Sequence, residues 1–122
     1  MVSGRVPQKG EIWHVKGDPV EGREFKGPHY YLVISQRELV AALGTAVCVP
    51  VTSGGGGASR SQGVTVYLDG NSTDIGKVTG VALCYQVRSL DLTACKASYA
   101  ATVEPHVMDE ILSLVVDLID PR

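Results

Sequence analysis

The sequence predicts a small, mostly β domain: an antiparallel barrel with a short internal helix and a C-terminal helix. A length of 122 residues fits one domain. An apolar fraction of 44% is enough for a packed core and argues against disorder. Many short β-favouring segments precede a single long apolar helix pattern near the end of the chain. The prediction is therefore one domain over residues 1–122.

Strand patterns dominate the first half of the chain. β-branched and aromatic residues are typical of strands, and they fill three segments: Glu11–Val15, His29–Ile34 and Thr45–Val51. Between the first two, Lys16–Pro28 contains three glycines and two prolines, which predicts a loop. A loop of this length in a compact domain is often functional.

A short helix is predicted between the second and third strands. Ser35 is placed to cap its first turn, and Glu38, three residues later, completes the pattern of a capping box. The helix is expected to reach about Ala42, and Gly44 is expected to end it.

The second half opens with four consecutive glycines, Gly54–Gly57, which predict a mobile loop. Val64–Leu68 then alternates, with Val64, Val66 and Leu68 on one face and Thr65 and Tyr67 on the other. The remaining predictions are a turn at Asp69–Asn71, two strands or one long bent strand over Val78–Leu83 and Tyr85–Leu90, and a last edge strand at Ala100–Val103.

A C-terminal helix is predicted over Pro105–Ile119, because proline is favoured in the first turn. It carries two apolar stripes, Val107/Ile111/Leu114/Val115/Leu118 and Met108/Leu112/Val116/Ile119. A helix that is apolar over so much of its circumference is covered on more than one side. The core of the same subunit can cover one stripe, and a partner subunit is expected to cover the other. The alternative is deep burial within one domain.

Composition limits the cellular setting and the partners. No apolar run approaches the ~20 residues that span a membrane, and the first residues have no apolar core of a signal peptide. Three cysteines without metal-type spacing indicate free thiols in a reducing cytoplasm, with Cys48 in the core. The net charge of −2 is concentrated at the end, because residues 1–103 hold ten Lys and Arg against eight Asp and Glu. This pattern allows either scattered surface charge or a weakly basic face.

The first long loop gathers groups that could carry acid–base chemistry. Arg23, Glu24, Lys26 and His29 lie within seven residues. A guanidinium can bind phosphate oxygens with two parallel hydrogen bonds, and an imidazole can exchange a proton near neutral pH. Glu24 could act as a base or orient Arg23. The alternative is a solvated charged loop.

A second group of polar residues follows the third strand. The hydroxyls of Thr52 and Ser53, with the backbone N–H groups of Ser53 and Gly54, could bind a phosphate. Capping of the strand end is the alternative. His14 is expected to be an ordinary strand histidine and His106 a surface residue. No Cys/His group has zinc spacing, and the glycine run lacks the Lys-Ser/Thr of a nucleotide-binding loop.

Three blocks, taken in order and spacing, resemble the MazF/PemK family of bacterial toxin–antitoxin toxins. They are Gly10-Glu11-Ile12-Trp13 with Asp18-Pro19 and Gly22-Arg23-Glu24, then Val49–Gly54, then Thr79–Asp91. The resemblance covers roughly Val6 to Asp120. It implies an SH3-like barrel of the CcdB/MazF/PemK type that forms a homodimer.

The resemblance also implies site residues. Glu24 matches the family's catalytic Glu, His29 stands where an Arg is expected, and Arg23 stands where PemK-like members have a His. Thr52 and Ser53 stand at a phosphate-contacting position. The implied catalytic residues are Arg23, Glu24, His29 and Thr52. The implied RNA-binding residues are Glu11, which is expected to support the site, and Lys26, Ser53, Arg60, Thr79, Tyr85 and Gln86.

Three positions depart from the family pattern. PemK-like members have an Arg-x-Asp pair before the Gln that matches Gln86, and here Leu83 and Tyr85 occupy those positions. Cys95 stands where an Arg is expected. Tyr85 could stack on a base, but none of the three supplies positive charge.

The function implied is a metal-independent, sequence-specific endoribonuclease that cleaves single-stranded mRNA without a cofactor. It would be the toxin of a type II pair, with a PemI/MazE-like antitoxin as its partner and DNA contacted only through that antitoxin. Two alternatives are a catalytically impaired member that only binds its antitoxin, and a CcdB-like gyrase poison, because fold does not fix function.

Overall fold

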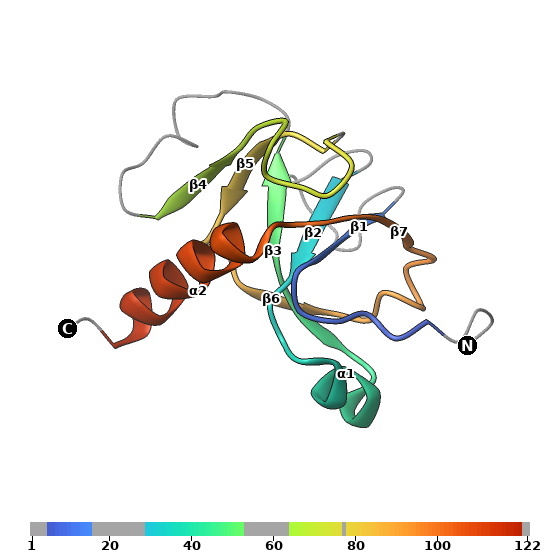
Figure 1. Ribbon diagram of the computed structural model, residues 1–122. Helices are drawn as coiled ribbons and strands as arrows, with labels where there is room; N and C mark the ends of the chain where they lie inside the picture. Colours follow the sequence, from blue (N-terminus) through green and yellow to red (C-terminus); the bar gives the residue numbers. More distant parts are fainter. Residues whose placement is uncertain (1–4, 16–28, 53–63, 77, 121–122) are drawn as a thin grey trace.

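The computed structural model describes residues 5–15, 29–52, 64–76 and 78–120, which form seven strands and two helices (Figure 1). The predicted class, mostly β with a short internal helix and a C-terminal helix, is confirmed. In chain order the elements are β1 (Glu11–Val15), β2 (His29–Val33), α1 (Arg37–Leu43), β3 (Ala46–Thr52), β4 (Thr65–Leu68), β5 (Gly80–Leu83), β6 (Arg88–Leu90), β7 (Ser98–Thr102) and α2 (Pro105–Ile119).

All seven strands belong to one antiparallel sheet. Its order is β4-β5-β3-β2-β1-β7, and β6 pairs with the first half of β3. The long strand β3 therefore has β2 along one side and both β5 and β6 along the other. In the described part of the chain, the two end strands β4 and β7 do not pair with each other, so the sheet is not closed into a barrel.

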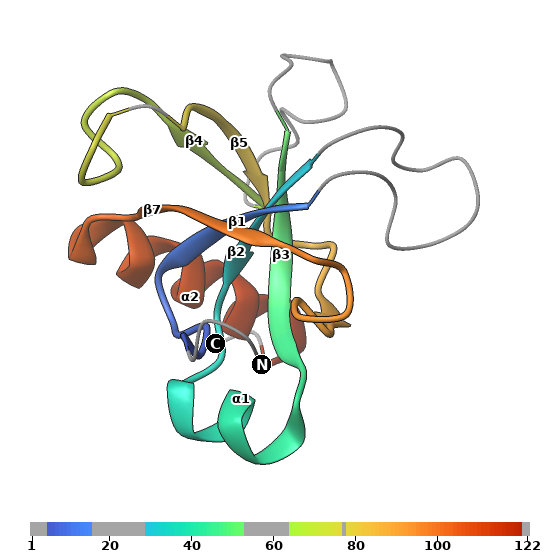
Figure 2. The ribbon, with the colours of Figure 1, turned by 90° about the vertical axis from the view of Figure 1, so that its right-hand side faces the viewer.

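The two faces of the sheet are covered by different clusters. On one face, Ile12, Leu32 and Val49 pack with Val107 and Ile111 of α2, which lies across this side of the sheet (Figures 1 and 2). On the other face, a second cluster contains Trp13, Val15, Tyr31, Val33, Val40, Ala46, Cys48, Leu90 and Leu92. Successive strand residues point to opposite faces, which explains why β1, β2 and β3 contribute to both clusters.

The first stripe of α2 is largely buried and the second only in part. Val107, Ile111 and Val115 are buried, whereas Leu118 near the end of the helix is 43% exposed. In the second stripe Met108 is buried, but Val116 is 42% exposed and Ile119 is 80% exposed. The helix therefore covers the core with one side and leaves apolar side chains on another.

The start of α1 differs from the prediction, whereas its end is confirmed. Gln36 is the N-cap and makes no side-chain capping bond. Ser35 Oγ instead accepts the backbone N–H of Val47 at 3.0 Å. The Ser35 hydroxyl was expected to cap α1, but it instead links the segment after β2 to β3. At the other end, Gly44 adopts a φ of 80° and donates its N–H to Val40 O at 2.8 Å.

Several strands have bounds that differ by one or more residues from those predicted, β6 and β7 among them. The segment expected as strand Tyr85–Leu90 forms only β6, because residues 84–87 turn away from the sheet and Gln86 N donates to Leu83 O at 3.0 Å. The last strand, β7, begins and ends earlier than the predicted Ala100–Val103.

The C-terminal end of β7 is covered by the segment that follows β4. Thr73 forms an isolated bridge with Val103. The backbone N–H of Asp74 donates to Thr102 O at 2.8 Å, and Asp74 Oδ1 accepts the Thr102 N–H at 3.0 Å. Both outward backbone groups of Thr102 are thus satisfied.

Candidate active site

Four strands bring their ends together at one end of the sheet. Val15, the last residue of β1, pairs with His29, the first residue of β2. Tyr30 pairs with Val51, so His29 and Thr52 are the next residues of β2 and β3 beyond the last pair of that ladder. Thr52 in turn pairs with Val81 of β5. In Figure 2 these ends of β1, β2 and β3 lie together above the crossing of the strands.

Thr52 holds a polar atom in an unusual environment. Its Oγ1 is buried and has no hydrogen-bond partner among the residues that the structure describes. A buried hydroxyl without a partner costs roughly 1–3 kcal/mol, so such atoms are rare unless a ligand or water meets them. A hydroxyl can both donate and accept, which suits a phosphate oxygen or a ribose hydroxyl.

Several predicted site residues lie outside the described part of the chain. They are Arg23, Glu24, Lys26, Ser53 and Arg60, together with the glycine run Gly54–Gly57. For His29 only the backbone is described, as the first residue of β2. The two stretches that hold these residues join Val15 to His29 and Thr52 to Val64, so three of their four flanking residues lie at the end described above. Their roles stay predictions.

Thr79 and Tyr85 lie at opposite ends of β5. Thr79 is exposed and directly precedes Gly80, whose φ is 146°. Because Val81 pairs with Thr52, Thr79 lies at the same end of the sheet as Thr52. Tyr85 is 41% exposed and Gln86 is half-buried in the turn beyond the other end of β5. The structure therefore places Thr79 nearer than Tyr85 to the four strand ends.

The positions that depart from the family pattern have different surroundings. The side chain of Leu83 is only 4% exposed and belongs to the interior. Cys95 is half-buried and packs against the cluster that contains Cys48. Burial raises the pKa of Cys48 to about 12 and that of Cys84 to about 11. Burial also raises the pKa of Cys95. The three thiols are therefore protonated at neutral pH and are poor nucleophiles.

Glu11 is held by contacts within the protein. Its side chain is almost fully buried. Oε2 accepts from Arg5 Nη2 at 2.7 Å and from Gln8 Nε2 at 3.4 Å, and Oε1 accepts from Trp13 Nε1 at 3.0 Å and from the Gln8 backbone N–H at 3.1 Å. Arg5 also lies over the ring of Tyr99, 4.0 Å from its centroid. These contacts fit a supporting role for Glu11, and its contact with RNA stays a prediction.

The two remaining histidines occupy ordinary positions. His14 is half-buried within β1, and its ring lies 4.9 Å from that of Tyr30, centroid to centroid. His106 is exposed in the first turn of α2. Both agree with the expectation from the sequence.

The described residues provide neither a metal-binding cluster nor a membrane-spanning helix. No group of three or more His, Cys, Asp or Glu side chains there could hold a metal ion. None of the helices in this part of the chain is long and apolar enough to cross a membrane.

Comparison with known proteins gives consistent matches across the chain. A family model described as "PemK-like, MazF-like toxin of type II toxin-antitoxin system" matches residues 8–119. The Escherichia coli protein named endoribonuclease PemK is 36% identical over 105 residues, which are 86% of this chain and 76% of that protein. The protein named endoribonuclease toxin MazF, from Escherichia coli strain K12, is 33% identical over 98% of this chain and 99% of its own length.

A solved structure agrees with these matches. The crystal structure of MazF from Deinococcus radiodurans superposes with a TM-score of 0.78 at 26% identity, and the match covers 94% of this chain and 97% of that one. The residues matched by the family model include every described strand and both helices. The chain therefore belongs to the PemK-like, MazF-like toxin family of type II toxin–antitoxin systems.

Proposed function

We propose that this protein is the toxin of a type II toxin–antitoxin pair and that it cleaves single-stranded RNA at specific sequences. The names of its relatives, endoribonuclease PemK and endoribonuclease toxin MazF, support this activity. The structural observation that carries the proposal is the buried Oγ1 of Thr52 at the end of β3, which has no hydrogen-bond partner among the described residues. A phosphate oxygen of bound RNA would supply the missing hydrogen-bond partner.

The proposed reaction uses the RNA's own 2′-OH as nucleophile. The 2′-oxygen forms a bond to phosphorus as the bond from phosphorus to the 5′-oxygen breaks. Glu24 takes the proton of the 2′-OH, and His29 gives a proton to the departing 5′-oxygen. Arg23 stabilises the charge of the crowded phosphate, and Thr52 fixes its position. The products are a 2′,3′-cyclic phosphate and a 5′-OH. Because these side chains supply every proton and charge that the reaction needs, the proposal includes no metal ion.

The partners follow from the family and from the surface of α2. The cognate antitoxin, of the PemI/MazE kind, would bind the toxin and block RNA, and it would be the only link to DNA. A second copy of the chain would cover the exposed apolar side of α2. All three cysteines are free thiols, which supports the cytoplasm as the compartment.

Incubation of the purified protein with a long RNA in EDTA tests this proposal. The expected result is cutting at a short recurring sequence, with cyclic phosphate and 5′-OH ends. Cutting that disappears in EDTA and returns with a divalent ion would overturn the metal-independent mechanism. An intact RNA, combined with tight binding of the antitoxin, would instead identify an impaired member. If the protein does not cut RNA but inhibits gyrase, the CcdB-like alternative would be favoured.

A further inference from the structure

Tyr67 lies in the same cross-strand row as Thr52. Tyr67 of β4 pairs with Val81 of β5, and Val81 pairs with Thr52 of β3. Neighbouring strands are about 4.8 Å apart, so the Cα atoms of Tyr67 and Thr52 are separated by roughly 10 Å across the sheet. Paired residues point to the same face of the sheet, so all three side chains lie on one face, where Val81 is buried and Tyr67 is exposed.

The side chain of Tyr67 points away from the core. Its neighbours Val66 and Leu68 are buried in the cluster beneath α2, and successive strand residues alternate between faces. Tyr67 therefore lies on the opposite face, where it is 72% exposed. This is the largest exposed aromatic surface in the described part of the chain, and the hydroxyl of Thr52 lies two strands away.

We propose that Tyr67 is a base-stacking residue for the RNA substrate. The inference rests on the function proposed above and adds to it a residue that the sequence pattern left without a role. An aromatic ring stacks on a nucleic-acid base whatever the base is, because every base has a π-face. With a phosphate held at Thr52, a neighbouring unpaired base of the same strand would cover the ring of Tyr67.

The surroundings of Tyr67 favour single-stranded RNA over a protein segment as its occupant. The row joins an exposed aromatic ring to a buried hydroxyl for which the described part of the chain provides no hydrogen-bond partner. An apolar side chain of a protein would cover the ring and leave the hydroxyl unsatisfied. A nucleotide provides both a stacking face and polar oxygens, so it matches both features.

Kinetics and binding with three variants test the inference. The substrate is a single-stranded RNA that wild-type protein has been shown to cut, and the binding probe is the same RNA with a 2′-deoxy sugar at the cut site. Tyr67→Ala is expected to weaken binding about 5- to 150-fold and to raise KM, with little change in kcat. Tyr67→Phe keeps the ring and is expected to behave as wild type. Leu43→Ala, which removes a side chain of similar fractional exposure from α1, serves as the matched control.

The outcomes separate this inference from the proposed function. If wild-type protein cuts no RNA, the proposed function fails, and this inference fails with it. If wild-type protein cuts RNA and Tyr67→Ala has the same KM and Kd, the proposed function stands and the stacking role is overturned. A loss confined to antitoxin binding would also overturn it, in favour of a protein contact. A lower kcat with unchanged KM in Tyr67→Ala would likewise contradict stacking.

Discussion

Arg5 donates from Nη2 to Oε2 of the almost fully buried Glu11 at 2.7 Å, and the indole N–H of Trp13 approaches the other oxygen of the same carboxylate. Removing the carboxylate would leave the buried indole N–H without its partner. We therefore expect Glu11→Ala to lower the free energy of unfolding by about 2–4 kcal/mol. Arg5 is half-exposed, and screening by solvent limits the loss from Arg5→Ala to about 1 kcal/mol or less. Urea unfolding measures the loss of stability in both variants. Equal losses in Glu11→Ala and Arg5→Ala would contradict this expectation.

Thr52→Val is expected to affect stability and activity in opposite directions. Valine has nearly the same shape as threonine but no hydroxyl, so the variant removes a buried atom that has no hydrogen-bond partner within residues 5–15, 29–52, 64–76 and 78–120. The free energy of unfolding should stay the same or rise by about 1 kcal/mol. RNA cleavage should fall about 10- to 100-fold if the hydroxyl holds the phosphate. Thermal melts and single-turnover cleavage check the two effects, and unchanged cleavage would remove Thr52 from the site.

Arg23 and His29 are expected to carry the charge and the proton that Leu83, Tyr85 and Cys95 do not supply. Arg23→Ala should slow cleavage on the order of 10²–10³-fold, as loss of one stabilising donor does. His29→Ala should slow it as well and remove a pH-dependent limb near neutral pH. Tyr85→Phe should cost little, because its hydroxyl transfers no proton. Full activity in both Arg23→Ala and His29→Ala, with an inactive Tyr85→Phe, would move the site to the third sequence block.

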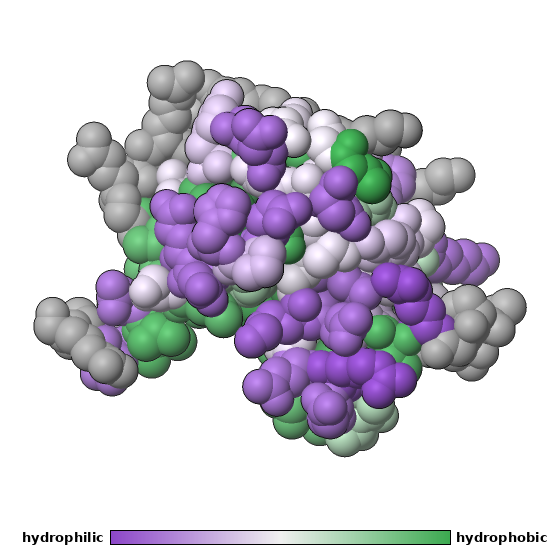
Figure 3. All heavy atoms as spheres, in the orientation of Figure 1, coloured by the Kyte–Doolittle hydropathy of each residue, from purple (hydrophilic) through white to green (hydrophobic). Residues whose placement is uncertain are grey.

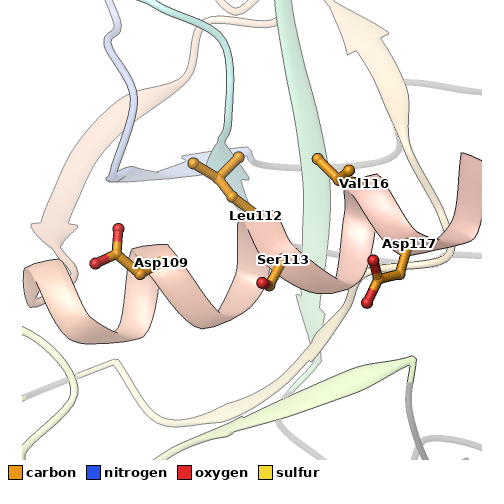
Figure 4. Close-up of a pocket in the computed structure, with 5 residues that line it drawn as sticks. All are labelled: Asp109, Leu112, Ser113, Val116 and Asp117. Atoms are coloured by element: carbon orange, nitrogen blue, oxygen red, sulfur yellow. The ribbon is translucent and has the colours of Figure 1, made fainter. Parts of the chain in front are cut away.

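The outer side of α2 is expected to form a contact between two copies of the chain. Leu112, Val116 and Ile119 line this side, and a shallow pocket there is bordered by Asp109, Leu112, Ser113, Val116 and Asp117 (Figure 4). Figure 3 shows hydrophobic side chains next to the hydrophilic ones on this side of the molecule. Light scattering at micromolar concentration should give the mass of a dimer. Val116→Asp should shift it towards the monomer.

Glu110→Gln provides the control for that experiment, because Glu110 is exposed on the same helix but does not border the pocket. It should leave the dimer intact. A monomeric wild-type protein would show that the exposed apolar side chains of α2 are not covered by a second copy.

Alkaline pH is expected to destabilise the fold through Cys48. Burial raises the pKa of this thiol from 9.0 to about 12, so the folded state holds the proton where the unfolded state has lost it. The stability contributed by the protonated thiol is full below pH 9 and is lost as the pH rises from 9 towards 12. Urea unfolding at pH 8, 9, 10 and 11 should show this decline. Cys48→Ala should be less stable at pH 8 but should decline less steeply with pH.

Elements set by local pattern could be predicted from the sequence. The apolar run of β3, the first-turn proline of α2 and Gly44 at the end of α1 each act within a few residues, and all three are found as expected. Ser35 shows where such reasoning fails, since its hydroxyl bonds to Val47, twelve residues away. The choice between the two uses of Ser35 depends on strand placement.

In the candidate site, too, some features follow from the local sequence and others depend on the placement of the strands. Chemistry-bearing residue types and the outward direction of Tyr67 follow from composition and alternation along the chain. The buried state of Thr52 Oγ1 and the row that joins Thr52 to Tyr67 depend on the register of three strands. Register is a property of the whole sheet, and one sequence without its fold does not reveal it.

The hydrogen bonds between Asp74 and Thr102 restrict how copies of this chain can join. An uncovered strand at the edge of a sheet offers a template on which another chain can add a strand, and this leads to aggregation. With both outward backbone groups of Thr102 occupied, only the first residues of β7 remain at that edge, which is too short a stretch for stable strand addition. A strand from a second copy therefore cannot extend the sheet by pairing with β7. Two copies that meet at this side of the molecule must contact each other through side chains.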